Sequence, residues 1–327
     1  MIGRQDMGDG RRETATRRER AVLAAVIGIL ALPIAAVPFQ AAHFFRYNRD
    51  DHVIVSRGVK RTYLLHVPAR YDASKPTPLV LSFHGAGLWG VAQRDMSGWD
   101  AVADDEGFIV AYPSGLGSRG IRVWHVNAAD RSSADNAFVS DLIDTLRARY
   151  NIDTTRIYAN GLSNGGGMSF GLSCALSDRI AAVGLVGSAQ TEPWRSCRDT
   201  TPVPMIDFHG TDDRFASYHG GTSWLLPQGQ AFPSQLVWTT RWAERNHCAL
   251  VPAESVVAPD VTRRRYSHCA RGADVVLYTI AGGGHTWPGG GPHPEWFTGR
   301  VTHSISASRI MWRFFQDHPL ERAAPQR

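Results

Sequence analysis

A serine between closely spaced glycines is the side chain of this sequence best placed for nucleophilic chemistry. Gly161, Ser163 and Gly165 form the pattern G-x-S-x-G, between the predicted strand RIYANG and a glycine-rich helix start. On such a strand-to-helix turn the glycines permit a very tight backbone, which exposes the serine hydroxyl at the sheet edge. We predict that Ser163 is a nucleophile and that the backbone N–H of Asn164 holds an oxyanion. The alternative is a glycine-rich turn with a solvated serine.

A serine hydroxyl is a weak nucleophile at neutral pH, so Ser163 requires a histidine base and a carboxylate that orients it. After a G-x-S-x-G turn these partners follow in the order acid, then histidine. The predicted strand PMIDFHG runs into Asp212 and Asp213, and VVLYTIAG runs into a glycine-rich loop with His285. We predict Asp213 as the acid and His285 as the base, with Asp212 as the competing acid. Asp207 lies within its strand and is expected to be structural.

The loop after the strand PLVLSFHG is expected to supply the second oxyanion donor. It reads HGAG from residue 84 to residue 87, and we assign the donor to the backbone N–H of Ala86, with Gly85 as the alternative. Tryptophans in predicted loops could line an acyl or sugar pocket, although each could instead pack in the core. These residues are Trp287, Trp89, Trp124 and Trp296.

Short apolar runs alternate with longer amphipathic stretches from His52 onward, a pattern typical of a mainly parallel sheet with helices on both faces. We predict eight strands: HVIVS, TYLLHVP, PLVLSFHG, GFIVAYP, RIYANG, AAVGLVGS, PMIDFHG and VVLYTIAG. Residues 134–150 form an expected helix that Asp135 caps. Residues 216–234 are rich in Gly, Pro and aromatic side chains and form an expected insertion over the active edge of the sheet.

The N-terminal part of the chain carries a different signal. Residues 21–39 are apolar and uncharged, close to the roughly 20 residues that cross a bilayer as a helix, and five arginines lie between residues 11 and 20. We therefore predict a cytoplasmic basic tail (1–20), a transmembrane signal-anchor or cleaved signal peptide (21–39) and a tether (40–51). The catalytic domain (52–320) and a tail (321–327) follow, outside the cytoplasm.

The net charge of +5 does not indicate a nucleic-acid partner, because no Lys/Arg run recurs along the chain. Four cysteines follow the apolar segment, where an oxidising compartment would allow two disulfides. Three connectivities are possible, and four buried thiols are the alternative. We favour the sequential pairing because it closes two short loops: Cys174 with Cys197, and Cys248 with Cys269.

In this order, these motifs resemble the secreted esterases of the poly(3-hydroxybutyrate) depolymerase and feruloyl or acetylxylan esterase group, which includes carbohydrate esterase family 1. The similarity covers about residues 52–317. It includes RTYLLHVPARYD, SGWDAVADDEGFIVAYPSG, LIDTLRARYNIDTTRIYANGLSNGGGMS, FHGTDD, WAERNHC and GGGHTWPGG.

The resemblance implies an α/β-hydrolase fold and a serine carboxylic-ester hydrolase that forms an acyl-enzyme and needs no metal or organic cofactor. It places the family's acid on Asp213, its histidine on His285 and its cysteine bracket on Cys248 and Cys269. The implied substrates are polyester oligomers and esterified plant polysaccharides or phenolic esters, with short-chain hydroxyalkanoate, feruloyl or acetyl groups. The chain departs from the family at Ala86, where polymer depolymerases often have Cys, and it lacks their polymer-binding domain.

Two other functions remain open from the sequence. An acyltransferase would use the same three residues to pass the acyl group to a cell-envelope sugar instead of water. A membrane-tethered binding protein would keep the fold without turnover. The intact set Ser163, Asp213 and His285 favours the hydrolase over the binding protein.

Overall fold

A computed structural model describes the chain except for residues 1–51, 119–120, 189–193, 223–230, 292–293 and 322–327. The chain divides into two units, Met1–Arg49 and Asp50–Arg327, and the elements below belong to the second. The predicted basic tail, membrane segment and tether lie outside the described residues. Within the described ranges, no helix combines the length and the apolar character that crossing a bilayer requires.

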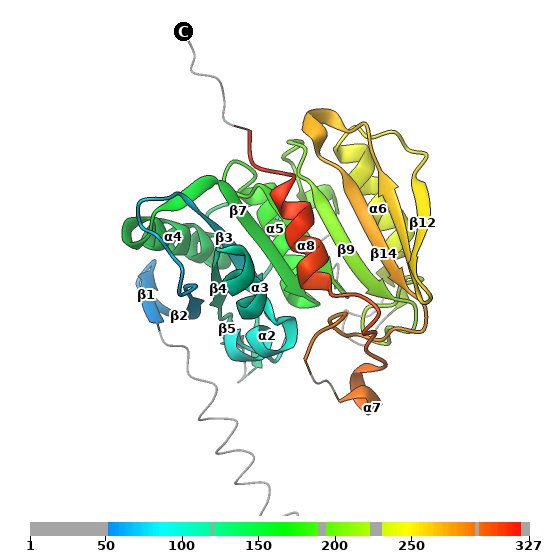
Figure 1. Cartoon of the computed structure of the whole chain (residues 1–327), viewed down its shortest axis with the longest axis horizontal. Helices are drawn as coiled ribbons and strands as arrows, with labels where there is room; N and C mark the ends of the chain where they lie inside the picture. Colours follow the sequence, from blue (N-terminus) through cyan, green and yellow to red (C-terminus); the bar gives the residue numbers. More distant parts are fainter. Residues whose placement is uncertain (1–51, 119–120, 189–193, 223–230, 292–293, 322–327) are drawn as a thin grey trace, which may run out of the picture. The chain divides into compact units, whose positions relative to one another are not determined.

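A single ten-stranded sheet runs through this unit (Figure 1). In sheet order its strands are β1 (His52–Ser56), β2 (Val59–His66), β4 (Ile109–Pro113), β3 (Thr77–Phe83), β7 (Ile152–Leu162), β8 (Ala182–Val186), β9 (Met205–Gly210), β14 (Val275–Ile280), β13 (Val261–Tyr266) and β12 (Ala253–Ala258). The strands from β4 to β14 in this order are mutually parallel, while β1, β2, β13 and β12 pair antiparallel at the two edges.

All eight predicted strands are present, but the predicted number of strands is wrong because β12 and β13 extend the sheet. The central strands were recognisable because most of their residues are apolar, and every residue of β3, β4, β8 and β9 is buried, as expected for strands covered on both faces. In contrast, no residue of β12 is buried, and β13 reads VTRRRY. An exposed, arginine-rich edge hairpin lacks the apolar signal on which the prediction relied.

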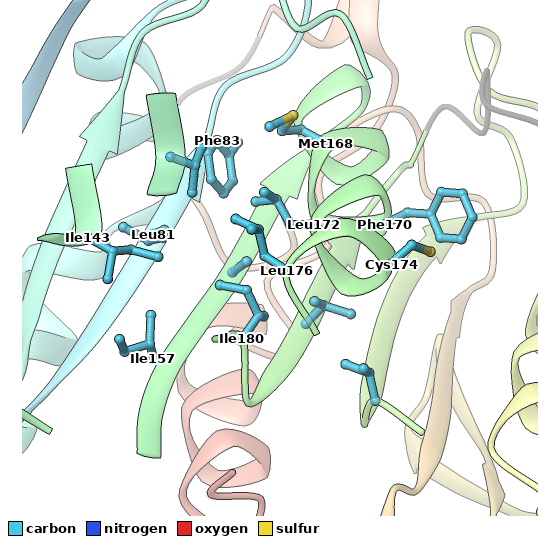
Figure 2. Close-up of a cluster of buried hydrophobic side chains, with 14 of the residues drawn as sticks. Leu81, Phe83, Ile143, Ile157, Met168, Phe170, Leu172, Cys174, Leu176 and Ile180 are labelled. Carbon is cyan, nitrogen blue, oxygen red and sulfur yellow. The ribbon is translucent and has the colours of Figure 1, made fainter. Parts of the chain in front are cut away.

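Helices cover both faces of the sheet, as predicted. The helices α2 (Gly90–Ser97), α3 (Trp99–Glu106) and α8 (Ala307–Gln316) pack on one face, and α4 (Ala134–Arg149), α5 (Asn164–Ala175) and α6 (Gln235–Arg245) on the other (Figure 1). Side chains along each strand alternate between the two cores, so Leu79 and Leu81 face α5 while Val80 faces the opposite layer. Figure 2 shows Met168 and Leu172 of α5 beside Phe83 in the core between the sheet and the layer of α4, α5 and α6.

Smaller elements connect these layers. They are the antiparallel ribbons β5 (Leu116–Ser118) with β6 (Ile121–Val123) and β10 (Gly221–Thr222) with β11 (Ala231–Phe232), the short helix α7 (Glu295–Thr298), and the 3-10 helices Trp194–Ser196 and Ala270–Gly272. The predicted insertion at 216–234 contains the β10–β11 ribbon in its described part.

Asp135 does not cap α4 as predicted. The N-cap position is Ser133, and Asp135 lies in the first turn with 2% of its side chain exposed. Its Oδ1 accepts a 2.6 Å bond from Arg61 Nη2, and Arg61, equally buried, also lies 3.9 Å from the ring centroid of Phe138. A buried arginine needs such a partner, since an unpaired charge in the core is costly. The carboxylate therefore joins α4 to β2.

The predicted disulfides are confirmed. Cys174 at the end of α5 is bonded to Cys197, and Cys248 beyond α6 is bonded to Cys269. Each bond attaches a helix end to a neighbouring loop on the α5 and α6 side of the sheet, which restricts the unfolded chain more than the folded one.

Candidate active site

Ser163 lies on a sharp turn between β7 and α5, as the sequence predicted. Its backbone has φ 55° and ψ −118°, a conformation that side-chain-bearing residues rarely adopt. A Cβ at Gly165 would lie 2.1 Å from the carbonyl oxygen of Phe83, and one at Gly161 would lie 2.4 Å from the carbonyl carbon of Gly165. Neither flanking position has room for a side chain. The G-x-S-x-G pattern is therefore a steric requirement of this turn.

His285 and Asp213 meet in the structure. Asp213 follows β9 and His285 follows β14, and His285 Nδ1 lies 2.7 Å from Asp213 Oδ2. The competing acid Asp212 is exposed and accepts a bond from the Thr211 hydroxyl instead. Because the two neighbouring carboxylates point in different directions, only Asp213 contacts the imidazole.

Gly187, at the end of β8, brings this pair next to the serine turn. The N–H of Ser163 donates to the Val186 carbonyl, and Gly187 follows directly. A Cβ on Gly187 would lie 3.1 Å from His285 Nδ1 and 3.2 Å from Asp213 Oδ2. The hydrogen bonds among the described residues include the His285–Asp213 pair but none from Ser163 Oγ to the imidazole. Such bonds often tighten only when substrate binds.

The environment of Asp213 keeps it ionised. Its Oδ1 accepts bonds from the backbone N–H groups of Phe215, at 2.8 Å, and Ala216, at 2.9 Å. Burial alone would raise the pKa of Asp213, but the facing His285 and His209 outweigh burial and hold the pKa well below its usual range. An ionised Asp213 can only accept a hydrogen bond, so Nδ1 of His285 carries the proton and Nε2 is left as the acceptor.

Sequence reasoning assigned no role to His209, which is fully buried in β9. Its Nε2 donates to the Ala216 carbonyl at 2.6 Å and lies 3.3 Å from Asp213 Oδ2. The signal that could have identified it is a histidine within β9, a strand whose six residues are all buried. A buried polar side chain must find a hydrogen-bond partner, and here the partners are groups of the site.

The loop after β3 lies against Ser163. A Cβ on Gly85 would be in ordinary contact with the serine Cβ, at 3.5 Å. Buried His84 shapes this loop: its Nε2 accepts the N–H of Gly115 at 2.9 Å, so its Nδ1 carries the proton and donates to the Gly85 carbonyl at 2.7 Å. Burial lowers the pKa of His84 to about 4, so it is neutral at physiological pH. Ala86 is exposed at the tip of this loop.

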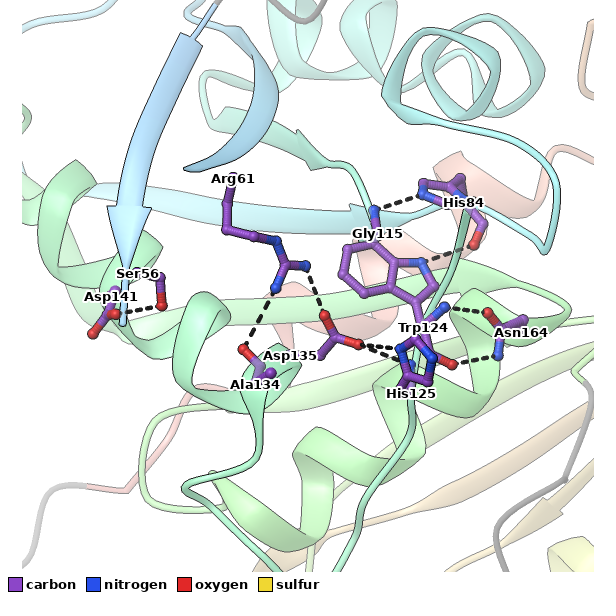
Figure 3. Close-up of polar contacts among 10 residues, drawn as sticks. All are labelled: Ser56, Arg61, His84, Gly115, Trp124, His125, Ala134, Asp135, Asp141 and Asn164. Atoms are coloured by element: carbon purple, nitrogen blue, oxygen red, sulfur yellow. Dashed lines mark hydrogen bonds and ion pairs between the residues drawn. The ribbon is translucent and has the colours of Figure 1, made fainter. Parts of the chain in front are cut away.

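Asn164 is the first residue of α5, and a helix offers no acceptor for the N–H at this position. Its side chain makes two bonds to the backbone of Trp124: Oδ1 accepts the Trp124 N–H at 2.7 Å, and Nδ2 donates to the Trp124 carbonyl at 3.1 Å. The next N–H, of His125, donates to Asp135 (Figure 3). A polar chain therefore leads from the Arg61–Asp135 pair to the start of α5.

Two of the predicted pocket tryptophans belong to the core. Trp287 is fully buried and donates its Nε1 hydrogen to Ser308 Oγ, while Trp124 is 3% exposed and donates to the His84 carbonyl. Neither has surface to offer a substrate, so these predictions are corrected. Trp89, before α2, is partly exposed, and Trp296 in α7 is 83% exposed. Position in a loop did not reveal which tryptophans are covered.

A cavity of about 500 Å³ lies away from this site, at the amino ends of the parallel strands, where Thr201, Arg271 and His318 contribute to its lining. In the described part of the chain, no cluster of His, Cys, Asp and Glu is arranged to hold a metal ion.

Comparison with known proteins gives concordant results. The family model described as esterase PHB depolymerase matches residues 61–194, which contain the β3 loop and the serine turn. Feruloyl esterase B of Piromyces equi is 30% identical over 232 residues, 69% of this chain and 42% of that protein. The bifunctional acetylxylan esterase/xylanase of Neocallimastix patriciarum is 28% identical over 224 residues, 68% of this chain and 31% of that protein. The chain thus spans less than half the length of these two relatives.

Among solved structures, the acetyl xylan esterase from Aspergillus awamori superimposes with a TM-score of 0.54 at 16% identity, over 78% of this chain and 93% of that one. This likeness concerns the fold. The mainly parallel sheet with a serine turn at the carboxyl end of a central strand defines an α/β-hydrolase fold. Within that class, the chain is similar to esterases of the PHB depolymerase and feruloyl esterase-like group.

Proposed function

We propose that this chain is a serine carboxylic-ester hydrolase in which Ser163, His285 and Asp213 form a catalytic triad. The observation that carries the proposal is the 2.7 Å pair of His285 Nδ1 and Asp213 Oδ2 beside a serine in a strained backbone conformation. A surface histidine and a surface serine would need neither feature. A strained conformation persists only where its surroundings impose it, and such strain is concentrated at functional sites.

In the proposed first step, Ser163 Oγ attacks the ester carbonyl carbon and His285 Nε2 takes the hydroxyl proton. The imidazole becomes a cation, and the ionised Asp213 stabilises it and fixes its orientation. The carbonyl oxygen becomes an oxyanion held by the N–H groups of Ala86 and Asn164, each worth about 3 kcal/mol of barrier. The neutral His84 supports the loop that carries Ala86 without bringing a competing charge to the oxyanion.

When the tetrahedral intermediate collapses, the bond to the leaving alcohol breaks and His285 Nε2 returns the proton to the alcohol oxygen. The acyl group remains on Ser163 Oγ. Water then attacks the acyl-enzyme while His285 takes one of its protons, and the proton passes back to Ser163 as the carboxylic acid leaves. These steps consume one water and require no metal or organic cofactor.

The names of the relatives guide the proposed substrates: feruloyl and acetyl esters of plant polysaccharide, with short-chain hydroxyalkanoate oligomers as a further ester class. Two disulfides support a location outside the cytoplasm, where thiols are oxidised. The apolar run at residues 21–39 is proposed to hold the enzyme at the membrane or to direct its export. The proposal keeps the division of the chain that the sequence predicts. Its segments are the basic tail (1–20), the membrane or signal segment (21–39), the tether (40–51), the catalytic domain (52–320) and the C-terminal tail (321–327).

The test is hydrolysis of 4-nitrophenyl acetate, butyrate and ferulate by the full chain and by Ser163→Ala. The variant is expected to lose at least about a thousandfold in kcat/KM. Ser177→Ala is the matched control, because Ser177 is similarly buried, 7% exposed against 8%, and lies just beyond the opposite end of α5. Equal activity of the Ser163 variant and the wild type would refute the assigned nucleophile, and an inactive wild type would refute the hydrolase.

A further inference from the structure

A run of aromatic rings leads from the predicted catalytic histidine to the surface. The ring of Phe215 lies 5.0 Å from the ring of His285, centroid to centroid, and also 5.0 Å from the ring of Phe297. Trp296 continues the run, with its ring 5.6 Å from that of Phe297. We call Phe215, Phe297 and Trp296 the aromatic run.

The outer end of the aromatic run is unusually exposed. Trp296 is 83% and Phe297 51% exposed, and they are the only aromatic residues among the large apolar side chains exposed in the described part of the chain. The others are aliphatic, such as Val256 on the edge strand β12. Scattered aliphatic exposure is normal, but two adjacent exposed aromatic rings that Phe215 connects to His285 indicate a binding surface.

The backbone connects the aromatic run rigidly to the histidine loop. The N–H of His285 donates to the Thr298 carbonyl at 2.7 Å, and the N–H of Gly284 donates to the Arg300 carbonyl at 2.9 Å. A Cβ at Gly284 would lie 2.2 Å from the Thr298 carbonyl oxygen, so the loop that carries His285 and the end of α7 are in direct contact. Helix α7 lies apart from the helices that cover the sheet in Figure 1, and these backbone contacts fix its position relative to His285.

The proposed mechanism determines which part of an ester meets this surface. His285 returns its proton to the leaving oxygen, so the alcohol lies on the imidazole side of the site, whereas the acyl carbonyl lies toward Ala86 and Asn164. The aromatic run begins at the imidazole and therefore faces the alcohol. Because its outer end is open to water, the alcohol must have an apolar face for the rings and polar edges for the solvent.

We propose that the aromatic run is the subsite for the leaving alcohol and that it takes a sugar ring of a carbohydrate ester. One face of a pyranose presents C–H groups to the negative face of an aromatic ring, while the hydroxyls at its edge stay hydrated. A flexible polyester strand has no such face. This inference rests on the proposed esterase function, and Trp296 is assigned a role in specificity, outside the chemical step.

The test compares two esters with the same acyl group: methyl ferulate and a feruloylated arabinoxylo-oligosaccharide. Trp296→Ala is expected to lower kcat/KM about tenfold for the oligosaccharide, mainly through KM, and to leave methyl ferulate within about twofold. Trp296→Phe, which keeps a ring, is expected to retain most of the activity on the oligosaccharide. Val256→Ala is the matched control, since Val256 is 77% exposed on the distant edge strand. Equal losses on both esters, or no loss on either, would overturn the subsite.

A binding measurement separates this inference from the proposed function. Ser163→Ala cannot turn over the ester, so titration of this variant with the feruloylated oligosaccharide reports binding alone, for example by calorimetry. Adding Trp296→Ala is expected to weaken that binding about tenfold. Unchanged binding in the double variant would overturn the subsite even if the wild type hydrolyses esters. Weakened binding with an inactive wild type would support the subsite while refuting the hydrolase.

Discussion

His209 and His285 contact the same oxygen of one carboxylate: His209 Nε2 lies 3.3 Å from Asp213 Oδ2, and His285 Nδ1 lies 2.7 Å from it. The second carboxylate oxygen accepts two backbone N–H groups, so Asp213 has partners on both sides. His209 also donates to the Ala216 carbonyl, which ties it to the loop that supplies one of these N–H groups. His209 is therefore positioned to hold the rotamer of Asp213, and hence the imidazole, without touching substrate.

Replacing His209 is expected to impair the chemical step. His209→Ala should lower kcat about tenfold with little change in KM, because a partner that orients an active-site group typically contributes an effect of this size. His209→Gln, which can still donate to Ala216, should recover part of the loss. Steady-state kinetics on a 4-nitrophenyl ester and thermal unfolding of each variant provide the check. A variant that loses thermal stability but keeps its kcat would show that His209 serves the core alone.

Asp207 lies two residues before His209 in the same strand, and its two carboxylate oxygens are buried without a hydrogen-bond partner. Burial raises the pKa of Asp207 from 3.8 to about 6, although the nearby His209 offsets part of this effect. Between these pH values the folded state holds a proton that the unfolded state has released. The stability contributed by this group is therefore present at low pH and lost as the pH rises through about 6.

Asp207→Asn should consequently stabilise the protein at pH 8, on the order of 1–3 kcal/mol, and have little effect at about pH 3, where the Asp207 carboxyl is protonated in both the folded and the unfolded state. Urea unfolding at the two pH values measures the difference. Asp212→Asn is the control, because the same substitution five residues later changes an exposed carboxylate. Destabilisation of Asp207→Asn at pH 8 would instead indicate that Asp207 and His209 form a favourable ion pair.

The sequence predicted those features for which only one kind of residue meets a steric or solvation requirement of the fold. The apolar strands β4 and β8 could be recognised because only a strand covered on both faces tolerates such runs. Gly161 and Gly165 marked the turn because any Cβ there would collide with neighbouring backbone. The order of acid and histidine along the chain then narrowed the partners of Ser163 to Asp213 and His285, which the structure places in contact.

Features that depend on long-range packing were not visible in the sequence. Trp287 follows His285 by two residues, yet its ring turns into the core toward Ser308, and nothing local in the sequence records that direction. Asp135 was interpreted as a cap because its partner Arg61 is 74 residues away. The hairpin of β12 and β13 at the edge of the sheet was missed because strands that are mostly uncovered need no apolar pattern. In each case the deciding neighbour is distant along the chain.

The Arg61–Asp135 pair gives the last prediction. Both side chains are 2% exposed, so Asp135→Asn would leave a buried guanidinium without a counter-charge, at an expected cost of about 3–5 kcal/mol. Glu254→Gln is the matched control, because the Glu254–Arg264 pair has a similar distance, 2.5 Å against 2.6 Å, but its side chains are 61% and 28% exposed, so its loss should cost less than about 1 kcal/mol. Urea unfolding of the two variants measures both losses.

The same substitution should also reach the active site. Asp135 accepts the N–H of His125, and the adjacent Trp124 holds the side chain of Asn164, the proposed oxyanion donor. Asp135→Asn should therefore reduce kcat more than Glu254→Gln does, even at temperatures where both variants are fully folded. A double change, Arg61→Met with Asp135→Leu, removes both charges and should recover stability without recovering kcat, because a leucine cannot accept the His125 hydrogen bond. Full recovery of kcat in that variant would show that the charge pair acts on stability alone.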